Sequence, residues 1–360
     1  MTPSYNHIHN SFKLNGTHFN RKYLEEVAYS FIKEGQPYES VIGNFLIDWL
    51  DDKDFVSVNT SGSTGKPKSV ELKKQAMVNS AIATGDFFNL KPTDSALHCL
   101  PSEYIAGKMM LVRAMILGLE LDFVKPSARP FINQEKQYQF CAMVPLQLSN
   151  SLDAIQNIET LIIGGSKVSQ SLQEELKMSS SKFYETYGMT ETVTHVAVRQ
   201  LKSLYGKADV YFNAMPKVNF SQDERQCLVI NAPKIINEAL VTNDIINLIS
   251  THSFEWLGRY DNVINSGGVK LFPEQIEQKL QPIFKDRFIV VRIKDKILGE
   301  KLVLIVENPS DTIDTITAKI HKLKTLHKFE IPKAIYCLDA FVETDSGKIQ
   351  RSKSLKKVLG

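Results

Sequence analysis

The sequence predicts an α/β protein: a large N-terminal domain with mostly parallel sheets flanked by helices and a small antiparallel part, followed by a small α+β C-terminal domain. Its 360 residues exceed the size at which a single hydrophobic core stops growing, so two domains are expected. Short apolar runs alternate with helical patterns across residues 96–178, as they do in a parallel sheet covered by helices. The pattern changes twice afterwards, near residue 205 and near residue 261.

The first part of the chain predicts two helices, a strand and a third helix. Apolar residues recur at helical spacing over residues 20–33, and Gly35 follows as a stop. A second amphipathic helix is expected over residues 39–50. Residues 55–58 predict a short strand, and a polar loop then leads to a helix over residues 75–88.

The middle of the chain supplies the alternating pattern of the parallel sheet. Strands are expected over residues 96–100, 121–124, 140–144 and 160–163. Helices are expected between or after them, over residues 109–117, 146–155 and 171–178. Ligands in such folds bind beyond the carboxyl ends of the strands.

The remaining elements divide the chain into the two expected domains. Antiparallel strands are expected over residues 226–230, 245–249 and 254–257. Beyond residue 261 we expect helices over residues 273–280 and 315–326 and strands over residues 288–293 and 302–306. We therefore place the large domain at residues 1–260 and the small domain at residues 262–360.

Composition narrows the classes of function. The net charge of +3 is too small to indicate a nucleic-acid partner. Residues 262–360 hold 18 Lys and Arg against 12 Asp and Glu. This basic balance fits either a polyphosphate ligand or a solvated lysine-rich surface.

Cysteine placement and the N-terminus indicate a cytoplasmic protein. The four cysteines lie far apart, without metal-ligand or disulfide spacing. The N-terminus carries no secretory apolar stretch, and the most apolar long segment, residues 108–121, is too short to cross a bilayer. No stable membrane insertion is therefore expected. A homodimer is the expected assembly, although no residue pattern specifies it.

The run from Thr60 to Lys68, TSGSTGKPK, has the composition of a phosphate-binding loop. Its glycines let the backbone approach an anion, and its hydroxyls, backbone N–H groups and lysines can meet phosphate oxygens. It is not a Walker loop, because Thr60 stands where that pattern needs glycine. A flexible surface linker is the alternative, but an expected strand before the loop and an expected helix after it favour phosphate.

A second run, Tyr184 to Thr192, is dense in groups that suit a nucleotide. Tyr187 offers a flat ring for a base, Thr190 a hydroxyl for a phosphate and Glu191 a hard oxygen for Mg²⁺. Taken alone, a Thr-Glu pair is also common as a helix cap.

Six runs in order carry a resemblance to a known family. TSGSTGKPK, YGMTET, TND at residues 242–244, WLGRYD at residues 256–261, SGGVKLFPEQIE and TDSGKIQR follow one another over residues 55–353. The series resembles the adenylate-forming superfamily of acyl-CoA synthetases, luciferases and peptide-synthetase adenylation domains. The resemblance implies ATP, Mg²⁺ and coenzyme A as ligands.

The resemblance also implies an ATP site. Tyr187 and Gly188 would lie against the base, Asp244 would bind the ribose hydroxyls, and Arg259 would contact ribose or phosphate. Thr190 would contact the α-phosphate, and Glu191 would bind Mg²⁺. The phosphate loop would contribute Thr60, Ser61, Gly62, Ser63, Thr64, Gly65 and Lys68, and the adenine turn Gly164, Gly165 and Ser166.

By the same resemblance, Lys348 is the lysine that reaches the reacting phosphate, and Asp261 is the hinge before a mobile C-terminal domain. A carboxylate attacking a phosphate meets charge repulsion, which a lysine and Mg²⁺ reduce. Ser266, Gly267 and Gly268 would flank the channel for the pantetheine arm of coenzyme A.

The segment from Leu100 to Arg113 resembles the substrate segment of o-succinylbenzoate–CoA ligases of menaquinone synthesis, with Tyr104 to Gly107 in place of their usual His-Ile-Ser-Gly run. Fewer residues precede the phosphate loop than in full-length relatives, so the chain resembles a short form of that ligase. The expected substrate is an aromatic dicarboxylate. Lys108 and Arg113 are the basic residues available to its unreacted carboxylate, and we favour Lys108, because Arg113 would point elsewhere on a helix.

Two alternatives share the same motifs. One is another acyl-CoA synthetase, acting on a fatty or aryl acid. The other is a stand-alone adenylation domain that loads a carrier-protein thiol. A non-catalytic nucleotide-binding module is disfavoured, because Glu191 and Lys348 are both present.

Overall fold

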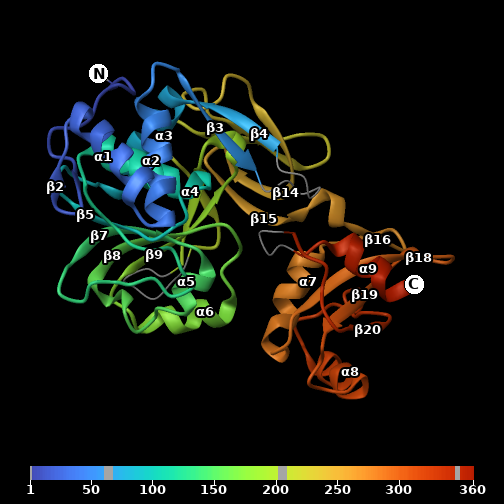
Figure 1. The fold of residues 1–360 in the computed structure, drawn as a ribbon. Helices are drawn as coiled ribbons and strands as arrows, with labels where there is room; N and C mark the ends of the chain where they lie inside the picture. Colours follow the sequence, from blue (N-terminus) through green and yellow to red (C-terminus); the bar gives the residue numbers. More distant parts are fainter. Residues whose placement is uncertain (1, 61–67, 202–208, 345–348) are drawn as a thin grey trace.

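The computed structural model describes residues 2–60, 68–201, 209–344 and 349–360. Figure 1 shows a larger body with helices on both faces of a sheet, and a smaller body beside it that begins after strand β15. Along the described ranges, no helix combines the length and apolar character that a membrane crossing needs.

Within the described residues, a mixed sheet of 13 strands forms the centre of the larger body. Its parallel part has the order β1, β6, β5, β7, β8, β9. These strands are Lys13–Leu14, Glu120–Phe123, Ser95–His98, Tyr138–Met143, Ile158–Ile163 and Lys182–Gly188, in the order just given. The short strand β2, Thr17–His18, pairs antiparallel with β1 at the outer edge.

Beyond β9 the same sheet continues with antiparallel strands in the order β10, β11, β15, β14, β13, β12. These are His195–Gln200, Phe212–Ala214, Ser253–Arg259, Leu240–Ser250, Cys227–Asn231 and Asn219–Gln222. A core around Phe220, Ile230 and Phe254 covers this part. The expected α/β class is confirmed, and the antiparallel part extends the parallel sheet without a break.

Two helical layers cover the parallel strands, as the alternation of side chains along each strand requires. Phe140 and Ile162 lie in one core, which is covered by α1 to α4. Their neighbours Cys141 and Leu161 lie in the opposite core, beneath α5 and α6. The helices are α1 Arg21–Glu34, α2 Pro37–Leu50, α3 Lys74–Phe88, α4 Ile105–Leu117, α5 Pro145–Ser149 and α6 Gln170–Glu175.

The secondary-structure elements on either side of the phosphate loop differ from those expected. Strand β3, Phe55–Thr60, is followed by a second strand, β4, Lys68–Lys73, and only then by α3. The two strands pair antiparallel, and Thr60 lies opposite Lys68. The expectation of a strand–loop–helix unit is therefore wrong. Strands β3 and β4 instead form a two-stranded sheet of their own, separate from the large sheet.

The smaller body contains a second sheet with cores on both faces. Its strands are β16 Ile264–Ser266, β17 Val269–Leu271, β18 Phe288–Asp295, β19 Gly299–Glu307 and β20 Ile335–Leu338. On β18 and β19, Val290 and Leu304 enter one core, whereas Ile289 and Ile305 enter the other. The helices are α7 Pro273–Leu280, α8 Ile313–Lys322 and α9 Arg351–Leu359. Asp261 lies in the 3₁₀ turn Tyr260–Asn262, between β15 and the first strand of this sheet.

Candidate nucleotide and acid cavities

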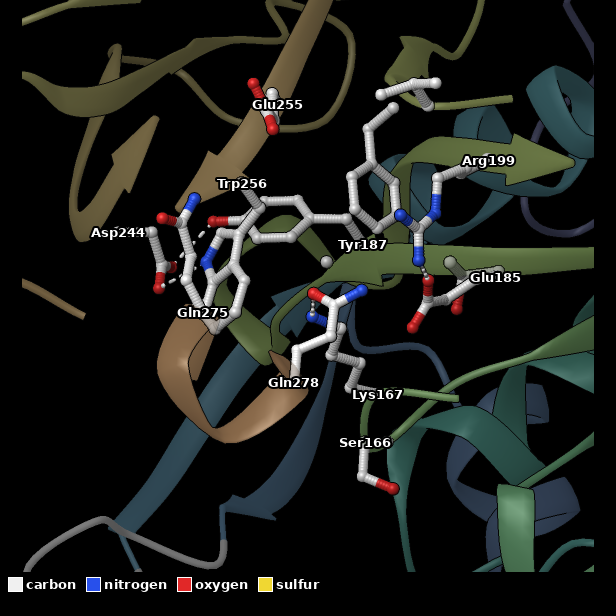
Figure 2. A pocket seen from close by; sticks show the side chains of 15 residues that line it. Ser166, Lys167, Glu185, Tyr187, Arg199, Asp244, Glu255, Trp256, Gln275 and Gln278 are labelled. Carbon is white, nitrogen blue, oxygen red and sulfur yellow. Dashed lines mark hydrogen bonds and ion pairs between the residues drawn. The ribbon is translucent and has the colours of Figure 1, made fainter. Parts of the chain in front are cut away.

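A cavity of about 470 Å³ opens where the last parallel strand, the antiparallel strands and α7 come together. Figure 2 shows that its labelled side chains come from both bodies. Tyr187 of β9 and Asp244 of β14 line it from the large sheet, and Gln275 and Gln278 of α7 line it from the small body. Its position at the carboxyl ends of β8 and β9 is where α/β folds bind ligands.

A buried carboxylate is the centre of hydrogen bonding in this cavity. Asp244 accepts from the Tyr187 hydroxyl at 2.7 Å and from the Trp256 indole N–H at 3.1 Å. An Arg259 guanidinium nitrogen lies 3.5 Å away, because β14 and β15 place Arg259 opposite Asp244. Burial, and then the negative charge of Asp244, raise the pKa of Tyr187. Tyr187 therefore stays a hydrogen-bond donor, and Asp244 keeps further acceptor capacity for a ligand.

A second ion pair forms another wall. Arg199 of β10 donates to Glu185 of β9, whose other oxygen accepts from the Val168 N–H at 2.9 Å. The Arg199 guanidinium also lies 5.2 Å from the centre of the Phe212 ring. The two side chains hold each other in place and so shape this wall of the cavity, although Arg199 Nε is buried without a hydrogen-bond partner among the described residues.

The small body reaches the cavity through one polar bridge. Lys167 Nζ donates to Gln278 Oε1 at 2.8 Å and lies 5.7 Å from the centre of the Trp256 ring. Burial lowers the pKa of Lys167, an effect that Glu185 and other carboxylates partly offset. Lys167 directly follows the turn from Gly164 to Ser166, of which Gly165 and Ser166 line this cavity.

A smaller cavity of about 290 Å³ adjoins the first one. Gly165, Thr186 and Gly188 line both, so ligands in the two cavities would touch. Most of its other lining is apolar, and polar groups come from Tyr104, Arg113, Thr190, Thr194 and His195. Such an apolar space with few polar groups suits an organic acid. The smaller cavity is therefore called the acid cavity below, and the larger one the nucleotide cavity.

Arg113 is the charged group of the smaller cavity. Its side chain is 1% exposed, and burial lowers its pKa to about 9. No carboxylate in the described part of the chain contacts it. A buried guanidinium without a counter-ion favours binding of an anionic ligand.

Lys108 lies elsewhere, which corrects the preference stated above. It is absent from the lining of the smaller cavity, and its Nζ lies 4.9 Å from the centre of the Phe45 ring, close to α2. Burial lowers its pKa, against the opposing charges of Asp48 and Glu103. Positions 108 and 113 lie about 140° apart around a helix, since each residue turns it by about 100°. The two side chains were correctly expected to diverge, but it is Arg113 that faces the cavity.

Gly107 is also not a cavity residue. A Cβ added there would lie 2.3 Å from the carbonyl oxygen of Pro101. The glycine allows the first turn of α4 to pack against that loop. It therefore shapes the acid cavity indirectly.

The two residues expected at the reacting phosphate lie next to each other at the edge of the acid cavity. Thr190 and Glu191 form a short 3₁₀ turn, Thr190–Thr192, after β9. Thr190 lines the cavity, and Glu191 is exposed. One carboxylate, together with phosphate oxygens and water, is the kind of ligand set that Mg²⁺ uses.

Several expected residues fall outside the described part of the chain or away from the two cavities. Ser61, Gly62, Ser63, Thr64, Gly65 and Lys348 lie outside the described residues, as do the side chains of Thr60 and Lys68. Ser266 pairs with Val269, so Gly267 and Gly268 form the hairpin turn between β16 and β17. Their φ angles of 57° and 83° are those that a tight two-residue turn requires.

Ten residues that line the larger cavity were not predicted as site residues: Lys167, Glu185, Thr186, Arg199, Val210, Phe212, Glu255, Trp256, Gln275 and Gln278. Most of them lie within or next to runs that had been singled out, as Gln275 lies within SGGVKLFPEQIE and Gln278 directly follows it. Arg199, Val210 and Phe212 lie outside these runs, in or beside β10 and β11, where no local pattern indicates a site.

Comparison with known proteins gives a consistent family. The family model described as AMP-binding enzyme matches residues 33–218. A 2-succinylbenzoate–CoA ligase of Staphylococcus aureus is 26% identical over 324 residues, covering 82% of this chain and 65% of the relative. One from Bacillus cytotoxicus is 24% identical and covers 84% and 69%. The chain thus spans slightly less than two thirds of the length of the Staphylococcus relative.

Solved structures agree. An acyl-CoA synthetase (AMP-forming)/AMP-acid ligase II-like protein from Dyadobacter fermentans has a TM-score of 0.61 and 33% identity, covering 92% of this chain and 98% of its own. The O-succinylbenzoate coenzyme A synthetase of Bacillus subtilis, solved with ATP and magnesium, has a TM-score of 0.71 and 21% identity. The structural match covers 83% of this chain and 69% of that protein.

Proposed function

Because this chain belongs to the AMP-binding enzyme family, we propose that it is an ATP-dependent acid–CoA ligase acting on an aromatic dicarboxylate of the 2-succinylbenzoate type. Such a reaction would belong to menaquinone biosynthesis. The observation that carries the choice of acid is Arg113, a buried guanidinium facing an apolar cavity next to the proposed nucleotide cavity. The names of the relatives agree with this choice.

ATP would occupy the larger cavity. The base would lie beside the ring of Tyr187 and the turn at Gly165, and the ribose hydroxyls would donate to Asp244. Asp244 is suited to this because its carboxylate is oriented by Tyr187 and Trp256 before any ligand arrives. Arg259 would add positive charge toward ribose or phosphate.

The acid would occupy the smaller cavity, with its reacting carboxylate at the shared wall. An oxygen of that carboxylate attacks the α-phosphorus, the bond from phosphorus to the bridging oxygen breaks, and pyrophosphate leaves. Thr190 would hold the α-phosphate, and Glu191 would hold Mg²⁺, which neutralises phosphate charge when bound. Lys348 would bring a further positive charge.

The second half-reaction would transfer the acyl group to coenzyme A. The deprotonated thiol attacks the acyl carbon, the bond from that carbon to the AMP oxygen breaks, and AMP leaves. We place the domains at residues 1–260 and 262–360, with Asp261 as the hinge about which the small domain turns between the two steps. Ser266, Gly267 and Gly268 would then border the pantetheine path. A cytoplasmic location and a homodimer remain part of this proposal.

ATP–pyrophosphate exchange with purified protein tests the function directly. Exchange supported by 2-succinylbenzoate, but not by benzoate or a medium-chain fatty acid, is the expected outcome. Exchange with only the fatty acid or benzoate would indicate a different acid–CoA ligase. Acyl-AMP formation without acyl-CoA on addition of coenzyme A would indicate loading of a carrier protein. No exchange with any of the three acids would contradict the proposal.

Arg113→Met tests the choice of acid. Methionine fills similar space without charge, so the KM for the diacid should rise about 10- to 100-fold, the loss of a charged hydrogen bond. Lys108→Met is the matched control, because it removes a cation from the same helix outside the cavity. Its KM for the diacid should stay within about twofold of the parent. If Lys108→Met raises the KM for the diacid and Arg113→Met does not, then Lys108 is the residue that binds the second carboxylate.

A further inference from the structure

The partners of Arg113 are all uncharged. Its Nε donates to the Thr84 hydroxyl at 3.3 Å, a terminal nitrogen donates to the Thr194 hydroxyl at 3.2 Å, and the other contacts Met110 Sδ at 3.7 Å. A guanidinium carries five N–H groups. Two of them therefore have no acceptor among the described residues. Hydrogen bonds therefore hold one side of the guanidinium in place, and N–H groups on its other side have no acceptor.

Thr84 fixes one side of the arrangement from outside the cavity. It lies on α3, is buried and does not line the acid cavity. Its hydroxyl proton goes to the Ser80 carbonyl oxygen at 2.9 Å, so the oxygen can only accept from its other neighbours. Those are Arg113 Nε and, at 3.4 Å, His195 Nε2. The proton of a neutral His195 must then be on Nε2.

His195, which unlike Thr84 lines the acid cavity together with Thr194, completes a closed ring. With its proton on Nε2, its Nδ1 accepts from the Thr194 hydroxyl at 3.3 Å, and Thr194 in turn accepts from Arg113. Burial, and then the charge of Arg113, hold the pKa of His195 well below its usual range. The imidazole stays neutral, and every hydrogen bond of the ring keeps one direction. The ring joins α3, α4 and the start of β10.

We propose that Thr84 and His195 are positioning residues that hold the Arg113 guanidinium toward the acid cavity and thereby select acids with a second anionic group. This inference rests on the proposed function. An acid with one carboxylate leaves the buried charge and its two free N–H groups without a partner, and the ring prevents the side chain from turning away. The protein then discriminates against acids with one carboxylate because they leave the Arg113 guanidinium unpaired, and not because of their shape.

Thr84→Val separates positioning from direct contact. Valine has nearly the shape of threonine but accepts no hydrogen bond, so Arg113 and His195 each lose a partner. The KM for 2-succinylbenzoate should rise about tenfold or more, while kcat stays within about twofold. The two monocarboxylic acids that each lack one of its carboxylates should be poor substrates for the parent, and their kcat/KM should change less than about twofold in the variant. Thr84→Ser, which keeps the hydroxyl, should restore most of the affinity.

Thr160→Val is the matched control, since Thr160 is a buried threonine of β8 outside the ring. It should leave the preference for the diacid unchanged. Thr84→Val overturns the inference if it leaves the diacid KM unchanged, or if it lowers kcat/KM equally for the diacid and the monoacids, as general damage would. If the parent protein fails to adenylate the diacid at all, the proposed function fails, and this inference fails with it. An active parent with an unaltered Thr84→Val preference defeats only the inference.

Discussion

Asp244 is a residue whose ligand role is set by its neighbours. Tyr187 and Trp256 each donate to it, and its carboxylate is buried at the wall of the larger cavity. Because these donors fix the two oxygens, a ribose hydroxyl bound here would meet an acceptor that needs no reorganisation.

We expect Asp244→Asn to raise the KM for ATP about 10- to 100-fold, because the amide replaces a charged acceptor and presents a donor to Tyr187 or Trp256. The KM for the acid should stay within about twofold, since the acid would lie in the other cavity. Tyr187→Phe keeps the ring and removes one donor, so its effect on ATP should be smaller. Titration of ATP and of acid in the exchange assay separates these effects. An unchanged ATP dependence would show that nucleotide binds elsewhere.

Residues of the nucleotide cavity could be predicted where a local run carried them. Tyr187 and Asp244 line it and lie in two separate runs. Arg259 lies in a third run and does not line the cavity, but pairing of β14 with β15 places it opposite Asp244. The residue that faces the acid could not be predicted in the same way. Helix α4 is buried on nearly all sides from Gly107 to Ile116, so no polar face shows the direction of Lys108 or Arg113.

At the scale of elements, periodicity predicted most helices well and short paired strands poorly. The helix expected over residues 146–155 is wrong, because α5 ends at Ser149 and only a separate 3₁₀ turn, Ile155–Asn157, follows. The helix over residues 273–280 has the expected bounds, because its apolar residues repeat on one face and proline begins it. Strand β4, KSVELK, was missed because polar residues alternate with few apolar ones. Its existence depends on backbone pairing with β3. The short strands β16, β17 and β20 likewise depend on their partners.

The first turn of α4 is the element on which the acid cavity depends. Gly107→Ala would force a Cβ to within 2.3 Å of the Pro101 carbonyl, so either the helix or the loop must move. We expect a loss of about 1–3 kcal/mol in the free energy of unfolding, as for overpacking of a buried site. The KM for the acid should also rise, because Tyr104 and Ile105 of this turn line the cavity.

Chemical denaturation and acid titration of the same Gly107→Ala preparation measure both effects. Glu103→Gln is the control, since Glu103 is exposed just before the same turn and does not line the cavity. A Gly107→Ala protein as stable as the parent would mean that the close approach to Pro101 is easily relaxed.

At the scale of the whole molecule, α7 connects the small body with both the larger cavity and the turn proposed as the hinge. Gln278 contacts Lys167 at the nucleotide cavity, and Glu274 accepts from Asn262 at 2.5 Å beside the turn that holds Asp261. Glu277 of the same helix forms an ion pair with Arg351 of α9, at 2.5 and 2.7 Å. One helix thus presents one buried carboxylate that is paired and another that is only half satisfied.

Glu274 should make the stability of the molecule depend on pH. Its Oε2 is buried and has no hydrogen-bond partner among the described residues. Burial raises its pKa above the usual 4.5, although Arg351 and Asn262 oppose the shift. A carboxyl whose pKa is raised on folding binds its proton more tightly in the folded protein than in the unfolded one. Its contribution is therefore favourable below pH 4.5 and is lost as the pH rises through the higher folded value.

Glu274→Gln, which keeps the shape without the charge, should therefore raise the free energy of unfolding at pH 7 by about 1 kcal/mol, the order of an unsatisfied buried group. The gain should shrink as the pH approaches 4.5, because the parent glutamic acid is then protonated. Glu277→Gln is the matched control on the same helix, and it should destabilise the protein, because it leaves Arg351 without its ion pair. Thermal unfolding of the three proteins between pH 5 and pH 8 measures both the expected gain in stability of Glu274→Gln and the expected loss in Glu277→Gln. A Glu274→Gln protein less stable than the parent at pH 7 would mean that the charged carboxylate has a partner that compensates its burial.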